Sequence, residues 1–358
     1  MKMPNHSRIH AIKPILIAAG LAAAATVCAS ASDAPLDLTA DSSNTAADSI
    51  VVDSESAAQT KWRALMAQTA TPDEGCFHAS YPNIVWEKED CKVAQPRVRP
   101  VHVKLTDDTE DVVGNTNDYV AEAKGLITLA SGGFSTKGVK SEKSVGVAAF
   151  HDAGILGSNE YTLQLNTNAK ETTSACAHHS GCTVWQQFVY STDYIAPGEA
   201  AVFMQYWLLN WGSSACPGGW SKYDADCVTN SALKPVPDVP ITDLGKLGLG
   251  ATAAAGGNDS VTFSYGTHAY SITGKDKVLD ISSVWKKAEF NVLGDAGGSR
   301  ADFNSGSSIA VTLLVLDGST AAPKCVAHDG TTGETNNLNL GKCAAFSGIP
   351  NIQFTESN

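Results

Sequence analysis

Short runs of β-branched and aromatic residues, separated by Gly, Asn and Asp, recur along most of this chain and constrain its fold more than any other feature. The pattern begins after about Thr71 and continues toward the C-terminus with almost no helical periodicity. Many short strands without intervening helices predict an all-β sandwich. We expect one such domain over residues 72–358. Clear examples are NEYTLQLNTN (159–168), CTVWQQFVYS (182–191), AAVFMQYWLLNW (200–211), KAEFNVLG (287–294) and SSIAVTLLVLDG (307–318).

The first 31 residues have the features of a signal peptide. Lys2, Arg8 and Lys13 form a basic stretch, residues 15–27 are apolar, and residues 29–31 supply the small side chains that a signal peptidase needs. The apolar stretch is too short to span a membrane. We therefore expect an exported protein, either secreted or periplasmic.

Residues 32–71 differ in composition from the rest of the chain. Between Ser32 and Thr60 there are six acidic residues, no basic residue and mostly Ala, Ser and Thr. Such a segment buries too little apolar surface to offset its ordering entropy, so we interpret residues 32–71 as a disordered linker or pro-segment. Within it, residues 57–68 can form a short amphipathic helix, with Trp62, Leu65 and Met66 on one side.

The cysteines fit an oxidising compartment. Cys28 leaves with the signal peptide; a lipid anchor on it is the alternative, which the branched Val27 disfavours. Eight cysteines then remain, and local pairing is the simplest hypothesis because each pair closes one short loop. Zinc binding is the competing interpretation, but no pair has the C-x-x-C spacing. The expected disulfides join Cys76 to Cys91, Cys176 to Cys182, Cys216 to Cys227 and Cys325 to Cys343.

The charge of the chain bears on its partners. Cleavage after residue 31 removes three of the 25 Lys and Arg residues and none of the 37 Asp and Glu residues, which leaves a net charge of about −15. Nucleic acid and anionic membranes are therefore not expected as partners. We expect no cofactor and no metal, although calcium in the Asp- and Asn-rich loops at 256–259, 294–306 and 329–337 is an open alternative.

The usual nucleophile motifs are missing, which turns attention to carboxylates and amides. The sequence contains no G-x-S-x-G, no H-E-x-x-H and, with four disulfides, no free cysteine. Successive side chains of a strand point to opposite faces. In CTVWQQFVYS, Gln186 and Gln187 must therefore lie on opposite faces, and at most one of them shares a face with Glu289.

Alternation predicts one sheet face that carries polar groups. Apolar residues of each strand point one way, and amides, tryptophans and a single carboxylate, Glu289, point the other way. This face is interpreted as a solvated surface, a carbohydrate site, or a catalytic site in which a partly desolvated carboxylate acts beside an amide donor. The predicted substrate-binding residues are Gln164, Gln205, Trp207, Trp211 and Asn291.

The order of these segments resembles that of the glutamic peptidases, the eqolisin group, over about residues 158–315. EYTLQLN, WQQFVYS and FMQYWLLNW are followed by a hairpin region, KAEFNV and ADFNSG. The resemblance implies a concanavalin-like β-sandwich and an acid-active endopeptidase. It implies that Glu289 is the general base and that Gln186 stabilises the oxyanion, with Gln187 as the rival for that role.

Two hypotheses follow. The first is an acid-active endopeptidase that cleaves polypeptides with Glu289 and Gln186 or Gln187. The second is a non-catalytic module that binds a glycan or a peptide through Trp207 and Trp211. The whole mature chain, including GCFHASYP (75–82) and GETNNLNL (333–340), is also similar to an uncharacterised group of secreted bacterial proteins. We expect a monomer.

Overall fold

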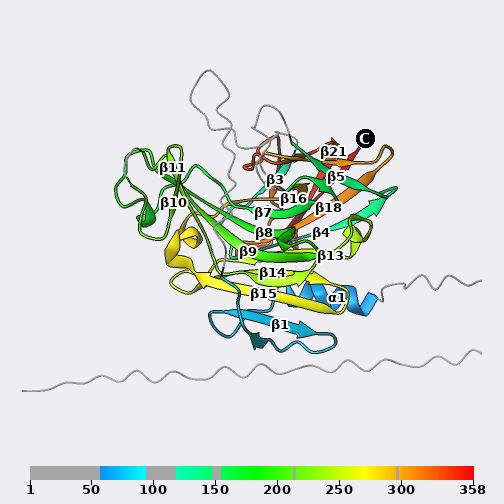
Figure 1. The fold of residues 1–358 in the computed structure, drawn as a ribbon, viewed down its shortest axis with the longest axis horizontal. Helices are drawn as coiled ribbons and strands as arrows, with labels where there is room; N and C mark the ends of the chain where they lie inside the picture. The colour runs from blue at the N-terminus through cyan, green and yellow to red at the C-terminus, as the bar shows by residue number, and fades with distance from the viewer. Residues whose placement is uncertain (1–56, 94–117, 147–154, 213–214, 296–297) are drawn as a thin grey trace, which may run out of the picture. The chain divides into compact units, whose positions relative to one another are not determined.

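The computed structural model describes residues 57–93, 118–146, 155–212, 215–295 and 298–358 (Figure 1). The chain divides into two units, 1–52 and 53–358, and every described residue belongs to the second. The predicted signal peptide and most of the predicted linker lie outside the described residues. The domain limits at residues 31 and 71 therefore stay predictions.

Two large antiparallel sheets form a sandwich, as the strand pattern predicted. In the first sheet, central strands are continued on one side by the β1–β2 hairpin and on the other by the C-terminal strands. Its order is β2 (Glu87–Glu89), β1 (Cys76–Ser80), β15 (His268–Lys275), β14 (Asn258–Tyr265), β13 (Leu247–Thr252), β4 (Leu129–Lys137), β18 (Ser308–Leu316), β22 (Asn351–Ser357) and β21 (Asn339–Phe346).

The second sheet carries the candidate site. Its longest strands, β8 and β9, form a hairpin at its centre, and β12 (Lys234–Pro237) pairs with β9 beside the main path. The order is β10 (Ser221–Tyr223), β11 (Asp226–Asn230), β9 (Glu199–Leu209), β8 (Thr183–Ala196), β7 (Tyr161–Asn166), β16 (Lys287–Gly294), β3 (Tyr119–Glu122) and β19 (Lys324–Ala327).

A smaller sheet and short helical turns complete the described secondary structure. The small sheet has the order β20 (Thr335–Asn336), β17 (Arg300–Phe303), β5 (Glu142–Val145) and β6 (Gly157–Ser158), and its β17–β20 pair is parallel. The described 3-10 turns are η2 (Ser174–Cys176), η3 (Ile241–Lys246), η4 (Asp276–Val278) and η5 (Ile281–Ser283).

The helix suggested for residues 57–68 is present as α1 (Ala57–Met66). Trp62 and Met66, one turn apart, are buried against Phe77, Ala79 and Trp86. Leu65, expected on the same side, is 47 % exposed, whereas Arg63 is buried and donates to the carbonyl of Gly266.

Packing between the sheets fixes the orientation of β16. Phe290 lies between the two sheets, 4.8 Å from the Phe134 ring, over Gly132 of β4. A Cβ atom at Gly132 would lie 2.1 Å from the Phe290 ring, so only glycine leaves room there. With Phe290 directed into the core, its neighbours Glu289 and Asn291 must point to the opposite face of the second sheet.

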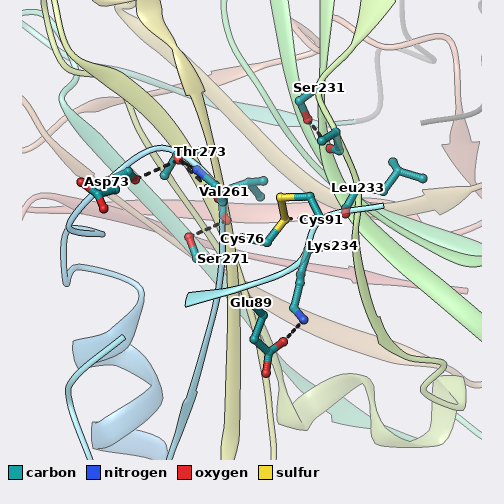
Figure 2. Close-up of a disulfide and its surroundings, with 12 residues drawn as sticks. Asp73, Cys76, Glu89, Cys91, Ser231, Leu233, Lys234, Val261, Ser271 and Thr273 are labelled. Atoms are coloured by element: carbon teal, nitrogen blue, oxygen red, sulfur yellow. Dashed lines mark hydrogen bonds and ion pairs between the residues drawn. A yellow bond between two sulfur atoms is a disulfide. The ribbon is translucent and has the colours of Figure 1, made fainter. Parts of the chain in front are cut away.

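Four disulfides join the four predicted pairs of near neighbours: Cys76–Cys91, Cys176–Cys182, Cys216–Cys227 and Cys325–Cys343. Figure 2 shows the first of them beside an ion pair between Lys234 of β12 and Glu89 of β2, which ties the β1–β2 hairpin to the second sheet. The last one links β19 of the second sheet to β21 of the first. Several disulfides in one domain are typical of extracellular proteins.

No helix within the described ranges is both long enough and apolar enough to span a membrane.

Candidate functional site

One row of residues crosses the second sheet and places the candidate groups on a single face. The register pairs Glu289 of β16 with Asn166 of β7, Asn166 with Gln187 of β8, and Gln187 with Gln205 of β9. Residues directly opposite one another in a sheet point to the same face. The row therefore brings Glu289 and three amides together on the face away from Phe290, which we call the polar face.

Of the two adjacent glutamines, Gln187 lies on this face and Gln186 does not. The Gln186 amide nitrogen points between the two sheets and donates to Asp259 Oδ2 of β14 at 3.0 Å. Phe188 and Tyr190, which alternate with Gln187 along β8, are likewise part of the main core. The preference for Gln186 over Gln187 is therefore corrected, because Gln186 is separated from Glu289 by the sheet itself.

A chain of hydrogen bonds connects Gln187 to Glu289. Gln187 Nε2 donates to Gln164 Oε1 at 2.9 Å, and Asn166 Nδ2 donates to the same Gln164 oxygen at 3.3 Å. Asn166 Nδ2 also lies 3.2 Å from Glu289 Oε2. On the other side, the Trp207 indole donates to the side-chain oxygens of both Gln187 and Gln205. The orientation of the Gln187 amide is thus fixed by its neighbours.

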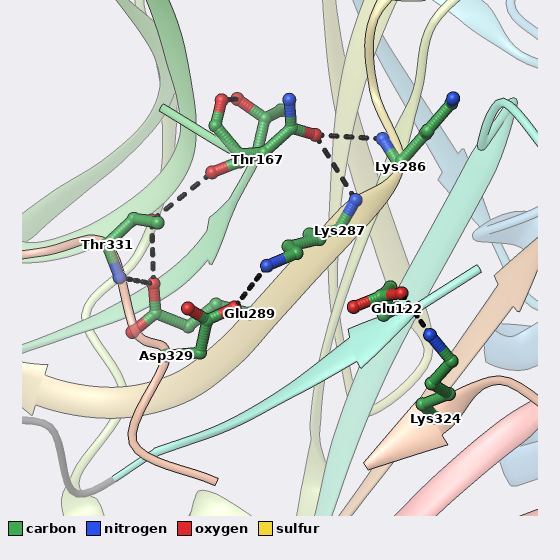
Figure 3. A network of polar contacts seen from close by, with 9 residues as sticks. Glu122, Thr167, Lys286, Lys287, Glu289, Lys324, Asp329 and Thr331 are labelled. Atoms are coloured by element: carbon green, nitrogen blue, oxygen red, sulfur yellow. Dashed lines mark hydrogen bonds and ion pairs between the residues drawn. The ribbon is translucent and has the colours of Figure 1, made fainter. Parts of the chain in front are cut away.

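Glu289 is buried beneath a segment that precedes β20. The backbone N–H of Thr331 donates to Glu289 Oε2 at 2.7 Å, and the Thr331 hydroxyl lies 2.9 Å from the same oxygen (Figure 3). A Cβ atom on Gly330 would lie 2.6 Å from Glu289 Oε1, so the segment can lie this close only with glycine there. Glu289 is 1 % exposed. We call residues 329–331 the cover segment.

Burial changes the protonation of Glu289. Loss of solvent, followed by the nearby Asp118 carboxylate, raises the pKa of Glu289 to about 8. Burial and then Glu356 raise the pKa of Asp118 to about 7. Three donors surround Glu289 Oε2, namely Asn166 Nδ2 and the N–H and hydroxyl of Thr331, whereas Oε1 is buried without a hydrogen-bond partner among the described residues. Below about pH 7, Glu289 is a carboxylic acid.

Asn291 lies on the same face as Glu289 but is fully buried. Its amide nitrogen donates to Asp118 and, at 3.0 Å, to Glu356 Oε1 of β22. Burial raises the pKa of Glu356 to about 7 as well. Asn291 therefore connects two buried carboxyl groups, whereas the sequence predicted that it binds substrate.

A cleft opens next to this network. Its volume is about 40 Å³. Three of the predicted residues, Gln164, Gln187 and Gln205, line it, whereas neither Glu289 nor Asn291 does. The other lining residues are Thr162, Val189, Ser191, Tyr194, Phe203, Asp295 and Glu334.

The two predicted tryptophans are placed differently from expectation. Trp207 points to the polar face but is 1 % exposed, packed against Trp185 and Leu209, so its ring offers no open surface. Trp211 belongs to the main core and stacks on His179 at 3.6 Å. The alternation that predicted a shared face fails because β9 ends at Leu209 and Asn210 has a φ of +52°, which turns the chain.

Sequence reasoning missed several groups at the site. Glu334 and Asp295 supply the carboxyls of the cleft, while Asp118 and Thr331 surround Glu289. The loop at 329–337 attracted notice only for its oxygen-rich composition. No local signal could place it over β16, because that contact joins segments about 40 residues apart in sequence.

Among the residues that the structure describes, no group of three or more His, Cys, Asp or Glu side chains could hold a metal ion.

Comparisons with known proteins give one set of similarities. No protein-family model matches the chain, and no curated protein matches it. A structure of scytalido-glutamic peptidase with a transition state analog inhibitor is similar at a TM-score of 0.31 and 10 % identity, covering 67 % of this chain and 96 % of that one. A second structure of the same peptidase, with a peptide-based transition state analog, has a TM-score of 0.29, 11 % identity and the same coverage. The resemblance to glutamic peptidases is thus confirmed as a structural similarity of low TM-score and low identity.

Proposed function

We propose that this protein is an acid-active endopeptidase whose reacting groups are Glu289 and Gln187 of the polar face. The observation that carries the proposal is the hydrogen-bonded chain from the Glu289 carboxyl through Asn166 and Gln164 to the Gln187 amide, which lines the cleft. A carboxyl group with a strongly perturbed pKa beside an oriented amide is a combination that peptide hydrolysis uses.

The proposed reaction requires the cover segment to move. In the closed arrangement Glu289 holds its proton because it is buried, and the N–H and hydroxyl of Thr331 bond to its Oε2. Displacement of Thr331 by a bound polypeptide exposes Glu289 and removes the largest cause of its raised pKa, so the carboxyl releases its proton and can act as a base.

Each group then has a defined role. Glu289 takes a proton from water as the water oxygen bonds to the scissile carbonyl carbon, and the Gln187 amide donates a hydrogen bond to the carbonyl oxygen as it becomes negative. Glu289 returns the proton to the nitrogen of the leaving amine as the C–N bond breaks. Atoms and charge balance with water as the only co-substrate.

Digestion of an unfolded protein by the purified mature protein tests the proposal between pH 2 and pH 7. We expect cleavage that is strongest in acid and is abolished by Glu289→Gln. Asp259→Asn is the matched control, since it also replaces a buried carboxyl by an amide, but on β14 of the first sheet, where the carboxyl bonds to Gln186. Equal activity of wild type and Glu289→Gln would contradict the assignment.

A non-catalytic binding module is the second candidate, and one observation favours it. Glu289 is covered and does not line the cleft, so the cleft can bind a ligand without any contact to that carboxyl. Absence of cleavage under all conditions, together with ligand binding that Gln187→Ala weakens, would support this alternative.

A further inference from the structure

The walls of the cleft combine two carboxyl groups with apolar surface. Two of its lining residues, Asp295 and Glu334, are acidic, three are glutamines, and none is Lys, Arg or His. We propose that the cleft receives the side chain of a lysine or arginine in the bound polypeptide. This inference rests on the proposed function, because it names the substrate residue that the proposed endopeptidase selects.

Glu334 is the group that we expect to meet the cation. Its side chain is held by Thr332, by Gln164 Nε2 at 3.5 Å and by the N–H of Gly298 at 3.4 Å. All of these are uncharged groups, and Glu334 is 7 % exposed. A carboxylate largely removed from water gains most from a partner of opposite charge, which an ammonium or guanidinium group entering the cleft supplies.

The rest of the cleft suits the carbon chain of such a residue. Tyr194 and Phe203 lie with ring centroids 4.5 Å apart and pack with Val189 in one apolar cluster. These side chains can contact the methylene groups of lysine or arginine, and the aromatic faces attract the charged end. A volume of about 40 Å³ holds roughly three water molecules, which matches the end of one side chain rather than a sugar ring.

Other ligand classes fit this composition poorly. An acidic side chain would meet two carboxyls without a cation among the described residues that line the cleft. A purely apolar side chain would fill the cleft without offering Glu334 a hydrogen bond or an opposite charge, which costs free energy.

Two measurements with matched peptides test the inference. Three peptides are compared that have lysine, norleucine or glutamate at one position and uncharged residues at all the others. The value of kcat/KM of the wild-type protein is measured for each of them at pH 5. Their binding to Glu289→Gln is measured by calorimetry, which needs no turnover. We expect the lysine peptide to exceed the norleucine peptide about tenfold in both measurements, and the glutamate peptide to be the weakest.

Glu334→Gln should lower the ratio between the lysine and norleucine peptides from about ten to about one in both measurements. Glu171→Gln is the control, since Glu171 is exposed and lies outside the cleft. Equal values for lysine and norleucine in the wild type overturn the inference, whether or not Glu334→Gln folds. Selective binding of the lysine peptide without cleavage contradicts the proposed function and supports this inference. Cleavage without any preference for lysine supports the proposed function and overturns this inference.

Discussion

Gln186 and Gln187 are adjacent and chemically identical, yet they belong to two different polar regions. Gln187 joins the amide network that ends at Glu289 and lines the cleft. Gln186 is enclosed between the sheets, where it bonds to Asp259. Both regions contain a buried carboxyl with a raised pKa, but only the first has a route to the cleft. A perturbed carboxyl therefore indicates a functional site only together with access to a ligand.

The Gln186 region shows what a buried carboxyl does without such access. Burial, followed by the charge of Asp276, raises the pKa of Asp259 well above its ordinary value. Asp276 in turn accepts from the backbone N–H of Ser282 at 3.0 Å and from its hydroxyl at 2.8 Å. These contacts link β14 to the η4 and η5 turns, so the polar groups there hold the fold together.

The largest expected effect concerns the region around Glu289 and is a loss of stability as the pH rises. The pKa values of Glu289, Asp118 and Glu356 are raised to about 8, 7 and 7, so the folded state binds these protons more tightly than the unfolded chain. Their contribution is fully present below about pH 4 and is lost as the pH rises through 7 to 8. Urea unfolding should therefore give a free energy of unfolding that is lower at pH 8.5 than at pH 4.5 by more than about 3 kcal/mol. A free energy of unfolding that rises over this range would contradict the burial of these acids.

Urea unfolding as a function of pH, combined with cleavage, distinguishes the Glu289 region from the Gln186 region. Glu289→Gln and Asp259→Asn should each make the pH dependence of unfolding shallower, since each removes one group with a raised pKa. Only Glu289→Gln should abolish cleavage.

The next effect compares the two glutamines in catalysis. Gln187→Ala removes the amide that faces the cleft, and loss of such an oxyanion donor costs about 10²–10³ in kcat, or roughly 3–4 kcal/mol. Gln186→Ala should leave kcat per folded molecule unchanged. Single-turnover cleavage at pH 4 gives the rate constant of both variants. An equal loss of rate in the two would contradict the assignment of Gln187 alone to the catalytic face.

A smaller effect concerns the Gln186 region by itself. Gln186→Ala takes away the side-chain donor to Asp259 in a sealed environment, and we expect it to destabilise the protein by about 1–3 kcal/mol. Gln186→Glu is a stronger perturbation, because it places a second acid against Asp259. As the pH rises, this variant should lose stability at a lower pH than the wild type does. Thermal denaturation between pH 4 and pH 8 gives both values.

The smallest effect concerns the cover segment. Lys287 Nζ pairs with Asp329 Oδ2 at 2.6 Å, with both side chains about one-third exposed. Lys287→Ala should cost less than about 1 kcal/mol of stability, as for other solvent-accessible ion pairs. If this pair holds the cover segment closed, Lys287→Ala should have a higher kcat than the wild type at low salt. Lys324→Ala is the control, because it breaks the Lys324–Glu122 pair elsewhere and should leave kcat unchanged.

The sequence predicted the layers and the directions of many side chains. In β16, Ala288, Phe290 and Val292 are all buried in the core, as alternation required, and Glu289 and Asn291 point the other way. These inferences succeed because the two-residue period of a strand is a local property. The preference for Gln186 failed because the period separates two neighbours without saying which of them faces the core.

The nature of the polar face could not be predicted in the same way. An open surface with accessible tryptophans was one expectation, whereas Thr331 and Gly330 cover Glu289, and Trp207 is buried. Both facts depend on packing between segments distant in sequence. Trp211 shows a different limit, since one residue of positive φ at Asn210 ends the alternation on which its placement relied.

The cover segment lies within the loop that Cys325 and Cys343 close, 18 residues apart. A protease that cut this loop once would therefore leave both ends attached to the domain. Chemical reduction would have the opposite consequence. The peptide chain would stay whole, while the disulfide between β19 and β21 would be broken. After a single cut in this loop, the residues over Glu289 would thus stay tethered to the domain.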